Sequence, residues 1–122
     1  MSIHYKQPYQ HPTPSSYRAP STPMQTFQQL KSGKMPVLKT FHLRGMTQEE
    51  AMTVATTALA STHKQSLYLL IHGKGKQSDN NYPVLKSMLL DFLYKHPQVN
   101  AYCQALPKDG GQGALYLLAT SR

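Results

Sequence analysis

The stretch that most constrains the fold is a short apolar run that ends in a histidine and a glycine-rich loop. Residues 67–71 are Leu-Tyr-Leu-Leu-Ile, and His72-Gly73-Lys74-Gly75 follows directly. An apolar run of this length, bounded by turn formers, predicts a buried strand rather than a helix. A helical pattern resumes at Pro83. Strand, glycine loop and helix is the order in which α/β proteins bind anions at the carboxyl ends of strands, so we expect an anion-binding loop here.

Apolar patterning on either side of this run predicts the element order βαβαββ. Strands are expected at residues 37–43, 67–71, 99–106 and 114–119, and helices at residues 47–63 and 83–96. Thr47 and Glu50 have the spacing of a capping box. A short strand–helix–strand crossover joins parallel strands, whereas a turn joins the last pair as an antiparallel hairpin. The predicted fold class is therefore α/β, a two-layer sandwich with a four-stranded mixed sheet and both helices on one face.

Strand alternation places mainly aromatic and apolar side chains on the other face of this sheet. The expected set is His42, Tyr68, Leu70, Tyr102, Tyr116 and Leu118. Tyrosines on an exposed sheet can stack on single-stranded bases. Alternatively, a short N-terminal helix covers them through Met24, Phe27 and Leu30. We favour the covered face, because an exposed patch of this kind promotes association.

The first 36 residues differ in composition from the rest of the chain. Six of the nine prolines lie there, with four basic residues and no acidic one. Residues 1–22, a basic tail rich in Pro, Tyr and Gln, carry too little apolar surface to offset the entropy of ordering, and disorder is predicted. Residues 23–36 are expected to form a short docked helix and a linker, and residues 37–122 the folded domain. The tail either follows a phosphate backbone or is a solvated leader.

The charge balance favours a polyanionic partner. Thirteen Lys and Arg residues stand against five Asp and Glu residues, which gives a net charge of +8 at pH 7. Nucleic acid fits this excess first and an acidic membrane second, although a merely soluble basic protein has the same balance. The single Cys103 excludes an intramolecular disulfide and zinc motifs built from cysteine pairs. With no membrane-spanning stretch and no apolar leader, we expect no membrane contact and a cytoplasmic location.

Three glycine-bearing loops are predicted to meet at one edge of the sheet. They follow the first strand at residues 44–45, the second strand at residues 72–76, and the hairpin at residues 109–113. Cations and backbone amides gathered there would form a phosphate-binding shelf, although turn geometry alone also explains the hairpin glycines. The predicted nucleic-acid contacts are Arg44, Gly45, Gly73, Lys74, Gly75, Lys76, Lys108, Gly110, Gly111 and Gly113.

These loops resemble the signatures of one protein family. Phe41-His-Leu-Arg-Gly45 resembles the LDLHG or LDLRG signature of the small MutS-related (Smr) domain. Ile71-His-Gly-Lys-Gly75 with Leu85-Lys86 resembles its HGKG…LK motif, and Ala105 with Gly110 to Ala114 resembles its A…GGxGA motif. The resemblance covers residues 38–119. It implies a sheet like that of the C-terminal domain of translation initiation factor three, nucleic-acid binding, and DNA-nicking or RNA-cleaving activity, as in several members.

One position departs from the family pattern and bears on the chemistry. The family's acidic residue falls on His42, and no substitute carboxylate is obvious, so we expect neither a metal nor another cofactor. RNA cleavage without metal needs one group to take the proton of the 2′-OH and another to protonate the leaving oxygen. His72 is the candidate acid or base, and His42 the candidate second group. Arg44 and Lys74 are expected to stabilise charge on the phosphorus.

Each histidine also has a plainer interpretation. His72 can cap a backbone carbonyl at the end of its strand, and His42 can be a polar residue on an open face of the sheet. The leading hypothesis is therefore an Smr-type endonuclease that cleaves RNA or nicks DNA. The alternative is a non-catalytic RNA- or DNA-binding module associated with ribosomes or DNA repair complexes. A small-molecule phosphate enzyme fits the loops but not the basic tail.

Overall fold

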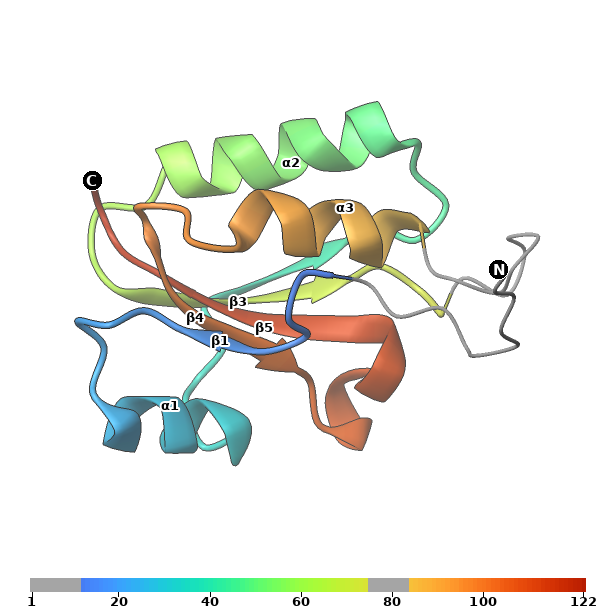
Figure 1. Ribbon diagram of the computed structural model, residues 1–122. Coiled ribbons are helices and arrows are strands. Elements are labelled where there is room, and N and C mark those ends of the chain that lie inside the picture. The colour runs from blue at the N-terminus through green and yellow to red at the C-terminus, as the bar shows by residue number, and fades with distance from the viewer. Residues whose placement is uncertain (1–11, 75–83) are drawn as a thin grey trace, which may run out of the picture.

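The computed structural model describes residues 12–74 and 84–122. The elements are β1 (Tyr17–Arg18), α1 (Met24–Lys31), β2 (Lys39–His42), α2 (Gln48–Ala60), β3 (Ser66–Ile71), α3 (Val84–Leu93), β4 (Val99–Gln104) and β5 (Ala114–Ala119), with 3₁₀ turns at Pro107–Asp109 and Gly111–Gly113. Helices α2 and α3 lie on one face of the sheet and α1 on the other, so helices cover both faces where we expected two layers (Figure 1). Each helix in the described ranges is too short or too polar to cross a bilayer.

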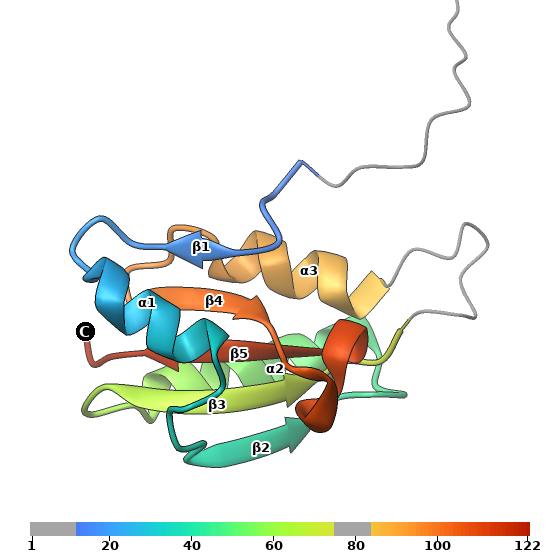
Figure 2. The ribbon, with the colours of Figure 1, turned by 90° about the horizontal axis from the view of Figure 1, so that it is seen from below.

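The single sheet places the carboxyl ends of three strands at one edge. Its order is β1-β4-β5-β3-β2, with β2 and β3 parallel and β5 antiparallel to both β3 and β4 (Figure 2). Strands β2, β3 and β4 therefore run in the same direction, as the sequence predicts. The last two strands form the predicted antiparallel hairpin. We call the edge where β2, β3 and β4 end the carboxyl edge.

The described sheet has five strands rather than the predicted four. The additional strand is β1, which pairs antiparallel with β4 through Tyr17 opposite Tyr102. It lies inside the segment for which we expected disorder, so that expectation is wrong for residues 12–22. Residues 1–11 lie outside the described residues. The Tyr17 ring contacts those of Tyr94 and Tyr102, with centroids 5.2 and 5.7 Å apart, and the Tyr102 hydroxyl donates to the Pro14 carbonyl at 2.6 Å. Specific aromatic packing thus orders a segment whose average composition predicts disorder.

The two faces of the sheet carry separate apolar clusters. The predicted capping box starts α2, with the Glu50 amide donating to the Thr47 hydroxyl and the Thr47 amide donating to the Glu50 carboxylate. The buried residues on the α2 and α3 side are Leu43, Ala51, Ala55, Leu59, Tyr68, Leu70, Leu89, Leu90, Leu93, Val99, Tyr102, Leu115, Leu117 and Ala119. Those on the α1 side are Phe27, Leu30, Leu67, Leu69, Ala101, Cys103, Ala105, Ala114, Tyr116 and Leu118.

The second face is covered by α1, as favoured above, but its residues differ from the predicted set. Tyr116 and Leu118 lie there, whereas Tyr68, Leu70 and Tyr102 face α2 and α3. Strand β3 is buried on both faces, so its continuous apolar run contains no signal for which side faces the helices. In β4, an irregularity between Val99 and Ala101 shifts the alternation. From α1, Phe27 and Leu30 are buried, whereas Met24 is 49% exposed and does not cover the sheet.

The packing of β1 predicts a measurable contribution to stability. Tyr17→Ala removes both ring contacts and is expected to lower the free energy of unfolding by about 1–3 kcal/mol, measured by urea denaturation. Tyr17→Phe keeps the ring and is the matched control, with an expected change within about 0.5 kcal/mol. Equal unfolding curves for the two variants would show that this segment does not pack on the domain.

Candidate nucleic-acid interface

The three glycine-bearing loops meet at the carboxyl edge through one backbone carbonyl. The Gly113 carbonyl, at the end of the hairpin, accepts hydrogen bonds from the amides of His72 at 2.9 Å and Gly73 at 3.0 Å. Gly73 has a φ of +89°, and a Cβ built there would lie 3.3 Å from Arg44 Cγ. The stem of the Arg44 side chain therefore packs on Gly73, and a larger residue at Gly73 would be both strained and crowded. This geometry joins the loop after β2, the loop after β3 and the hairpin.

Four glycines of this edge use their amides in hydrogen bonds that build the loops. The Gly73 amide is taken by Gly113, and the Gly113 amide donates to the Gly110 carbonyl at 3.0 Å. The Gly110 and Gly111 amides donate to the carbonyls of Pro107 and Leu106, at 3.3 and 3.0 Å. We expected such amides to contact phosphate, and these four are already paired. Gly75 and Lys76, which we also expected to contact nucleic acid, lie outside the described residues.

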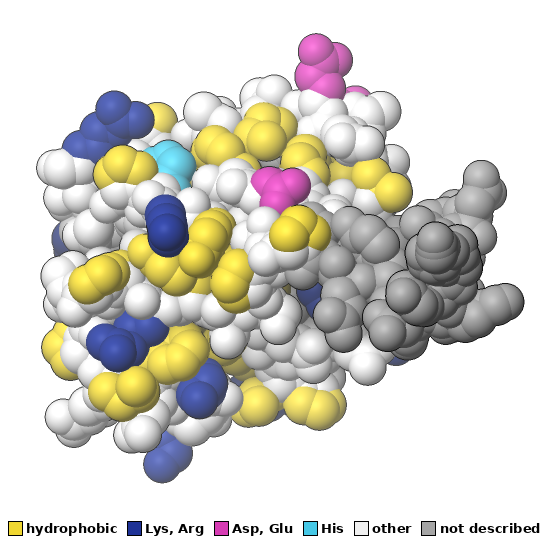
Figure 3. All heavy atoms as spheres, viewed as in Figure 1, with side chains coloured by type: hydrophobic (Ala, Val, Ile, Leu, Met, Phe, Trp, Pro, Cys, Tyr) yellow, Lys and Arg dark blue, Asp and Glu magenta, His cyan; other side chains and the backbone are white. Residues whose placement is uncertain are grey.

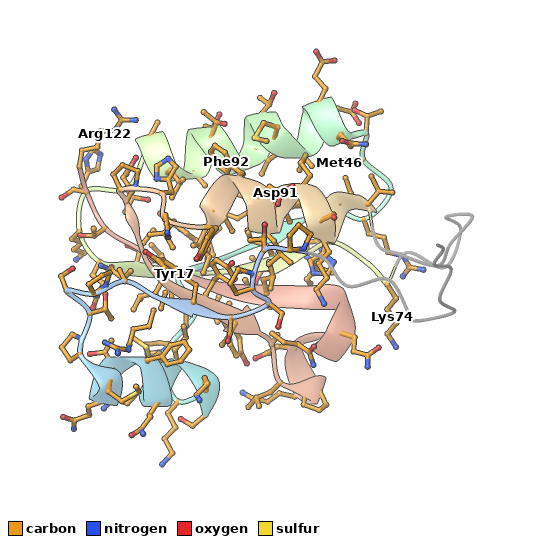
Figure 4. All side chains as sticks on the ribbon, in the orientation of Figure 1. Tyr17, Met46, Lys74, Asp91, Phe92 and Arg122 are labelled. Carbon is orange, nitrogen blue, oxygen red and sulfur yellow. The ribbon has the colours of Figure 1, made fainter. Side chains whose placement is uncertain are left out.

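Side chains therefore supply the positive charge available at this edge. Arg44 and Lys74 are exposed, and Lys74 extends from the end of β3 (Figure 4). Gly45, beside Arg44, is also exposed. Lys108, on the hairpin, is exposed and lies 3.8 Å from a carboxylate oxygen of Asp109. Positive charge is not confined to this edge, since Lys and Arg side chains are spread over the face shown in Figure 3. Charge alone does not locate the site, so the geometry around His72 carries more weight.

His72 lies where the three loops meet, and its side chain is 4% exposed. The ring Nδ1 lies 2.7 Å from the Gly73 carbonyl oxygen, so in the neutral ring Nδ1 carries the proton and donates it to that oxygen. The other nitrogen, Nε2, then presents a lone pair. Nε2 is buried and has no hydrogen-bond partner among the described residues. A buried, unpaired acceptor in a loop cluster is a candidate for contact with a ligand's proton donor.

The surroundings of His72 hold its ring neutral. Burial is the main cause that lowers its pKa, from 6.5 to about 4, and the positive charge of Lys86 acts in the same direction. The bond to the Gly73 carbonyl opposes them without reversing the shift. At neutral pH the ring can therefore accept a proton at Nε2 but has none to give from that atom. Both interpretations of His72 have a counterpart in the structure: Nδ1 caps a carbonyl, and Nε2 has no hydrogen-bond partner among the described residues.

His42, the second histidine we considered for catalysis, is not paired with His72. It is exposed and ends β2, where its backbone lies opposite Ile71. Its neighbours Phe41 and Leu43 pack toward α2 and α3, so strand alternation directs His42 to the opposite face. His72 follows Leu70, which packs on the α2 and α3 side, and Lys86 of α3 acts on its charge. The two imidazoles thus belong to different faces of the sheet.

Lys86 belongs to the LK part of the family motif, but we did not predict it as a catalytic or binding residue from the sequence. It lies in the first turn of α3, three, four and seven residues before the buried Leu89, Leu90 and Leu93. This spacing places it on the inward stripe of the helix, where it is half-buried. Burial lowers the pKa of its ammonium group. The detectable signal is a lysine at an apolar position of the helical pattern, but we read the stripe as Leu85, Met88, Leu89, Phe92 and Leu93, which excludes it.

No described carboxylate replaces the family's acidic residue. Asp109 accepts a hydrogen bond from the Tyr116 hydroxyl and pairs with Lys108, so it holds the hairpin together. Burial first, and then this hydrogen bond, raise the pKa of Tyr116 to about 12. Within residues 12–74 and 84–122, no cluster of three or more His, Cys, Asp and Glu side chains is arranged to hold a metal ion.

The depressed pKa of His72 predicts a pH-dependent stability. In the unfolded chain His72 binds a proton near pH 6.5, whereas in the folded chain it does so near pH 4. Below pH 6.5 the unfolded chain therefore binds more protons, and stability falls as the pH falls toward 4, by about 3 kcal/mol in all. His72→Asn keeps a donor toward the Gly73 carbonyl and cannot titrate. Urea denaturation from pH 7 to pH 4 should show this loss in the native protein and not in the variant; identical pH dependence would contradict it.

Comparisons with known proteins agree with this geometry. Residues 41–120 match the family model of the Smr domain. The probable DNA endonuclease SmrA of Escherichia coli (strain K12) is 32% identical over 90 residues, which cover 72% of this chain and 48% of that protein. The ribosome rescue factor SmrB of Aeromonas hydrophila is 31% identical over 91 residues, which cover 73% of this chain and 49% of that protein. The chain thus spans about half the length of the curated relatives it matches.

Solved structures show the same fold. The crystal structure of YdaL, a stand-alone small MutS-related protein from Escherichia coli, has a TM-score of 0.66 and 28% identity, covering 99% of this chain and 93% of that one. The Smr domain of Thermus thermophilus MutS2 has a TM-score of 0.54 and 25% identity, covering 67% of this chain and 98% of that one. The α/β fold, the loop signatures and the match over residues 41–120 show that the chain belongs to the Smr domain family.

Proposed function

We propose that this chain is an endonuclease that cleaves RNA or nicks DNA at the carboxyl edge of its sheet. The observation that carries the proposal is His72, a neutral and buried imidazole whose Nε2 lacks a partner among the described residues, set among loops that bear exposed cations. A proton acceptor beside cations suits an attack on a phosphodiester, since the attacking oxygen loses a proton while negative charge builds on the phosphate.

The relatives support this proposal and its choice of substrates. One is named a probable DNA endonuclease and another a ribosome rescue factor, so nucleic acid is the partner we propose, with contact to ribosomes or DNA repair complexes. Because the chain covers about half of each of these proteins, their whole activities do not transfer directly.

The proposed mechanism gives a separate role to each of four residues at the carboxyl edge. Nε2 of His72 accepts the proton of the attacking oxygen, which is the 2′-OH in RNA or a water molecule for DNA. The Gly73 carbonyl fixes the ring through Nδ1, at 2.7 Å. Arg44, whose stem packs on Gly73, presents a guanidinium that can bind the phosphate in the ground state and in the transition state. Lys74 adds a second exposed cation.

A cleavage assay tests the proposal. The protein is incubated with labelled single-stranded RNA, structured RNA and supercoiled plasmid, each with and without EDTA. We expect the wild type to cleave at least one of them in EDTA, and His72→Asn to lose this activity by about 100-fold or more while still binding, because general base catalysis contributes about 10²–10⁴-fold. Arg44→Ala should weaken both binding and cleavage.

The matched control for His72 is His42→Ala, at the end of the neighbouring strand. Because His42 faces away from His72, this variant should retain activity. Circular dichroism first establishes that all variants are folded. A folded His72→Asn protein that cleaves at the wild-type rate would overturn the role of His72, and a wild type that binds all substrates without cutting any would overturn the endonuclease.

That second outcome corresponds to the other candidate function, a non-catalytic nucleic-acid-binding module. Two observations favour it: the exposed His42 occupies the position of the family's acidic residue, and Asp109 is engaged by Tyr116. Under this candidate the cations at the carboxyl edge bind phosphates, and His72 is a structural cap of the Gly73 carbonyl.

Both candidate functions predict that Lys74 contacts phosphate. Each phosphate contact releases about one counterion, so Lys74→Ala should flatten the plot of log affinity against log salt by about one unit. The matched control is Lys39→Ala at the amino end of β2, an exposed lysine whose Nζ lies 5.0 Å from the Phe41 ring centroid. Its slope should match that of the wild type. Unchanged slopes for both variants would show that the carboxyl edge is not the interface.

A further inference from the structure

Lys86 occupies a position that is unusual for a lysine. It lies on the stripe of α3 that buries Leu89, Leu90 and Leu93 against the sheet, yet it keeps a titratable ammonium group. Lysine is rarely placed on such a stripe unless its charge has a role or a partner. Because Lys86 lies in the first turn of α3, its flexible stem starts between the helix and the sheet. The first turn of α3 lies at the same end of the sheet as the carboxyl end of β3, from which the His72 loop starts (Figures 1 and 2). The positive charge of Lys86 also lowers the pKa of His72.

We propose that Lys86 is the general acid of the cleavage reaction, the group that protonates the leaving 5′-oxygen when the chain cleaves RNA. This inference rests on the proposed endonuclease function and adds the second proton-transferring group that such a reaction requires. Two-group catalysis needs a donor and an acceptor on opposite sides of the phosphorus, because the attacking and leaving oxygens lie in line.

The other described residues near the site do not fit this role. His72 is neutral at physiological pH and its single proton, on Nδ1, is held by the Gly73 carbonyl. The Arg44 guanidinium does not release a proton in proteins. His42 faces the opposite side of the sheet, and the Asp109 carboxylate accepts from Tyr116. Of the described groups at this edge, Lys74, Lys86 and Lys108 remain. Lys74 is exposed, Lys108 is exposed and pairs with Asp109, and Lys86 is the one that is half-buried on the inward stripe of α3.

The reaction balances with these two groups. Nε2 of His72 takes the proton of the 2′-OH, and the 2′-oxygen forms a bond to phosphorus. The bond between phosphorus and the 5′-oxygen breaks, and that oxygen takes a proton from the Lys86 ammonium. The products are a 2′,3′-cyclic phosphate and a free 5′-OH, and the enzyme is left with a protonated His72 and a neutral Lys86. Exchange with water restores both groups, so no metal or redox partner takes part in the step.

Burial makes Lys86 a better acid than an exposed lysine. An ordinary ammonium, with a pKa near 10.5, gives up its proton poorly at neutral pH, whereas burial lowers the pKa of Lys86 toward the range where general acids work best. The neutral His72 and the ammonium of Lys86 also carry one positive charge rather than two, so they can lie near each other without strong repulsion. The same environment thus suits the acceptor and the donor.

A substrate with a modified leaving group separates proton donation from charge. A sulfur atom in place of the bridging 5′-oxygen leaves as a thiolate, which needs no proton. Lys86→Arg keeps the positive charge but cannot donate a proton, so it should slow cleavage of ordinary RNA about 100-fold or more and cleave the sulfur-substituted RNA within a few fold of the wild type. The control Lys39→Arg, at an exposed lysine of the amino end of β2, should cleave both substrates at nearly the wild-type rate.

The wild-type protein provides a second test that needs no variant. With ordinary RNA, the rate should fall at alkaline pH as Lys86 loses its proton, and with the sulfur-substituted RNA this alkaline decline should disappear. A Lys86→Arg protein that is equally slow on both substrates, or a wild type whose alkaline decline is the same for both, would overturn the assignment of Lys86. A wild type that cleaves neither substrate would instead overturn the proposed function itself.

Discussion

The carbonyl of Gly113 organises the carboxyl edge, because it accepts the amides of both His72 and Gly73. These two bonds continue the pairing of β3 with β5 beyond the last residue of the strand and bring the hairpin against the histidine loop. The loop after β2 joins them through the stem of Arg44, which packs on Gly73. The amides of Gly73, Gly110, Gly111 and Gly113 all donate to backbone carbonyls, so they are not available to a ligand. Because these amides are paired within the protein, we expect side chains rather than backbone amides to bind an anion at this edge.

Burial then determines what those side chains can do. His72 follows β3 and is buried, and Lys86 lies in the first turn of α3 and is half-buried; for both, the loss of hydration disfavours the charged form. For His72 the effect leaves a neutral acceptor, and for Lys86 it weakens the hold on a proton. Arg44 and Lys74 are exposed cations, and we propose that they hold the phosphate. In the proposed mechanism, the two buried residues transfer protons and the two exposed cations bind phosphate.

The sequence predicts the parts of this arrangement that depend on local patterns and strand direction. The capping box at Thr47, the βαβ crossover and the meeting of three loops follow from spacing and connectivity. Three features do not follow. Strand β1 depends on how Tyr17 packs against residues far along the chain. The sequence does not predict which side chains of β3 face α2 and α3, because both faces of this strand are buried and its residues do not alternate in polarity. The inward position of Lys86 was missed because the helical stripe was traced only through apolar residues.

The substitution of His42 for the family's acidic residue has a structural answer in the surroundings of His72. A carboxylate beside a catalytic histidine commonly fixes its tautomer by accepting the proton of one ring nitrogen. Here the Gly73 carbonyl does this from the next residue, at 2.7 Å. An acid at position 42 would lie on the face of the sheet that His72 does not use, so it would not be the group that orients this ring. Without an acid at position 42, His72 keeps its neutral, Nδ1-protonated form, and its Nε2, which has no partner among the described residues, is the atom on which the proposed base catalysis depends.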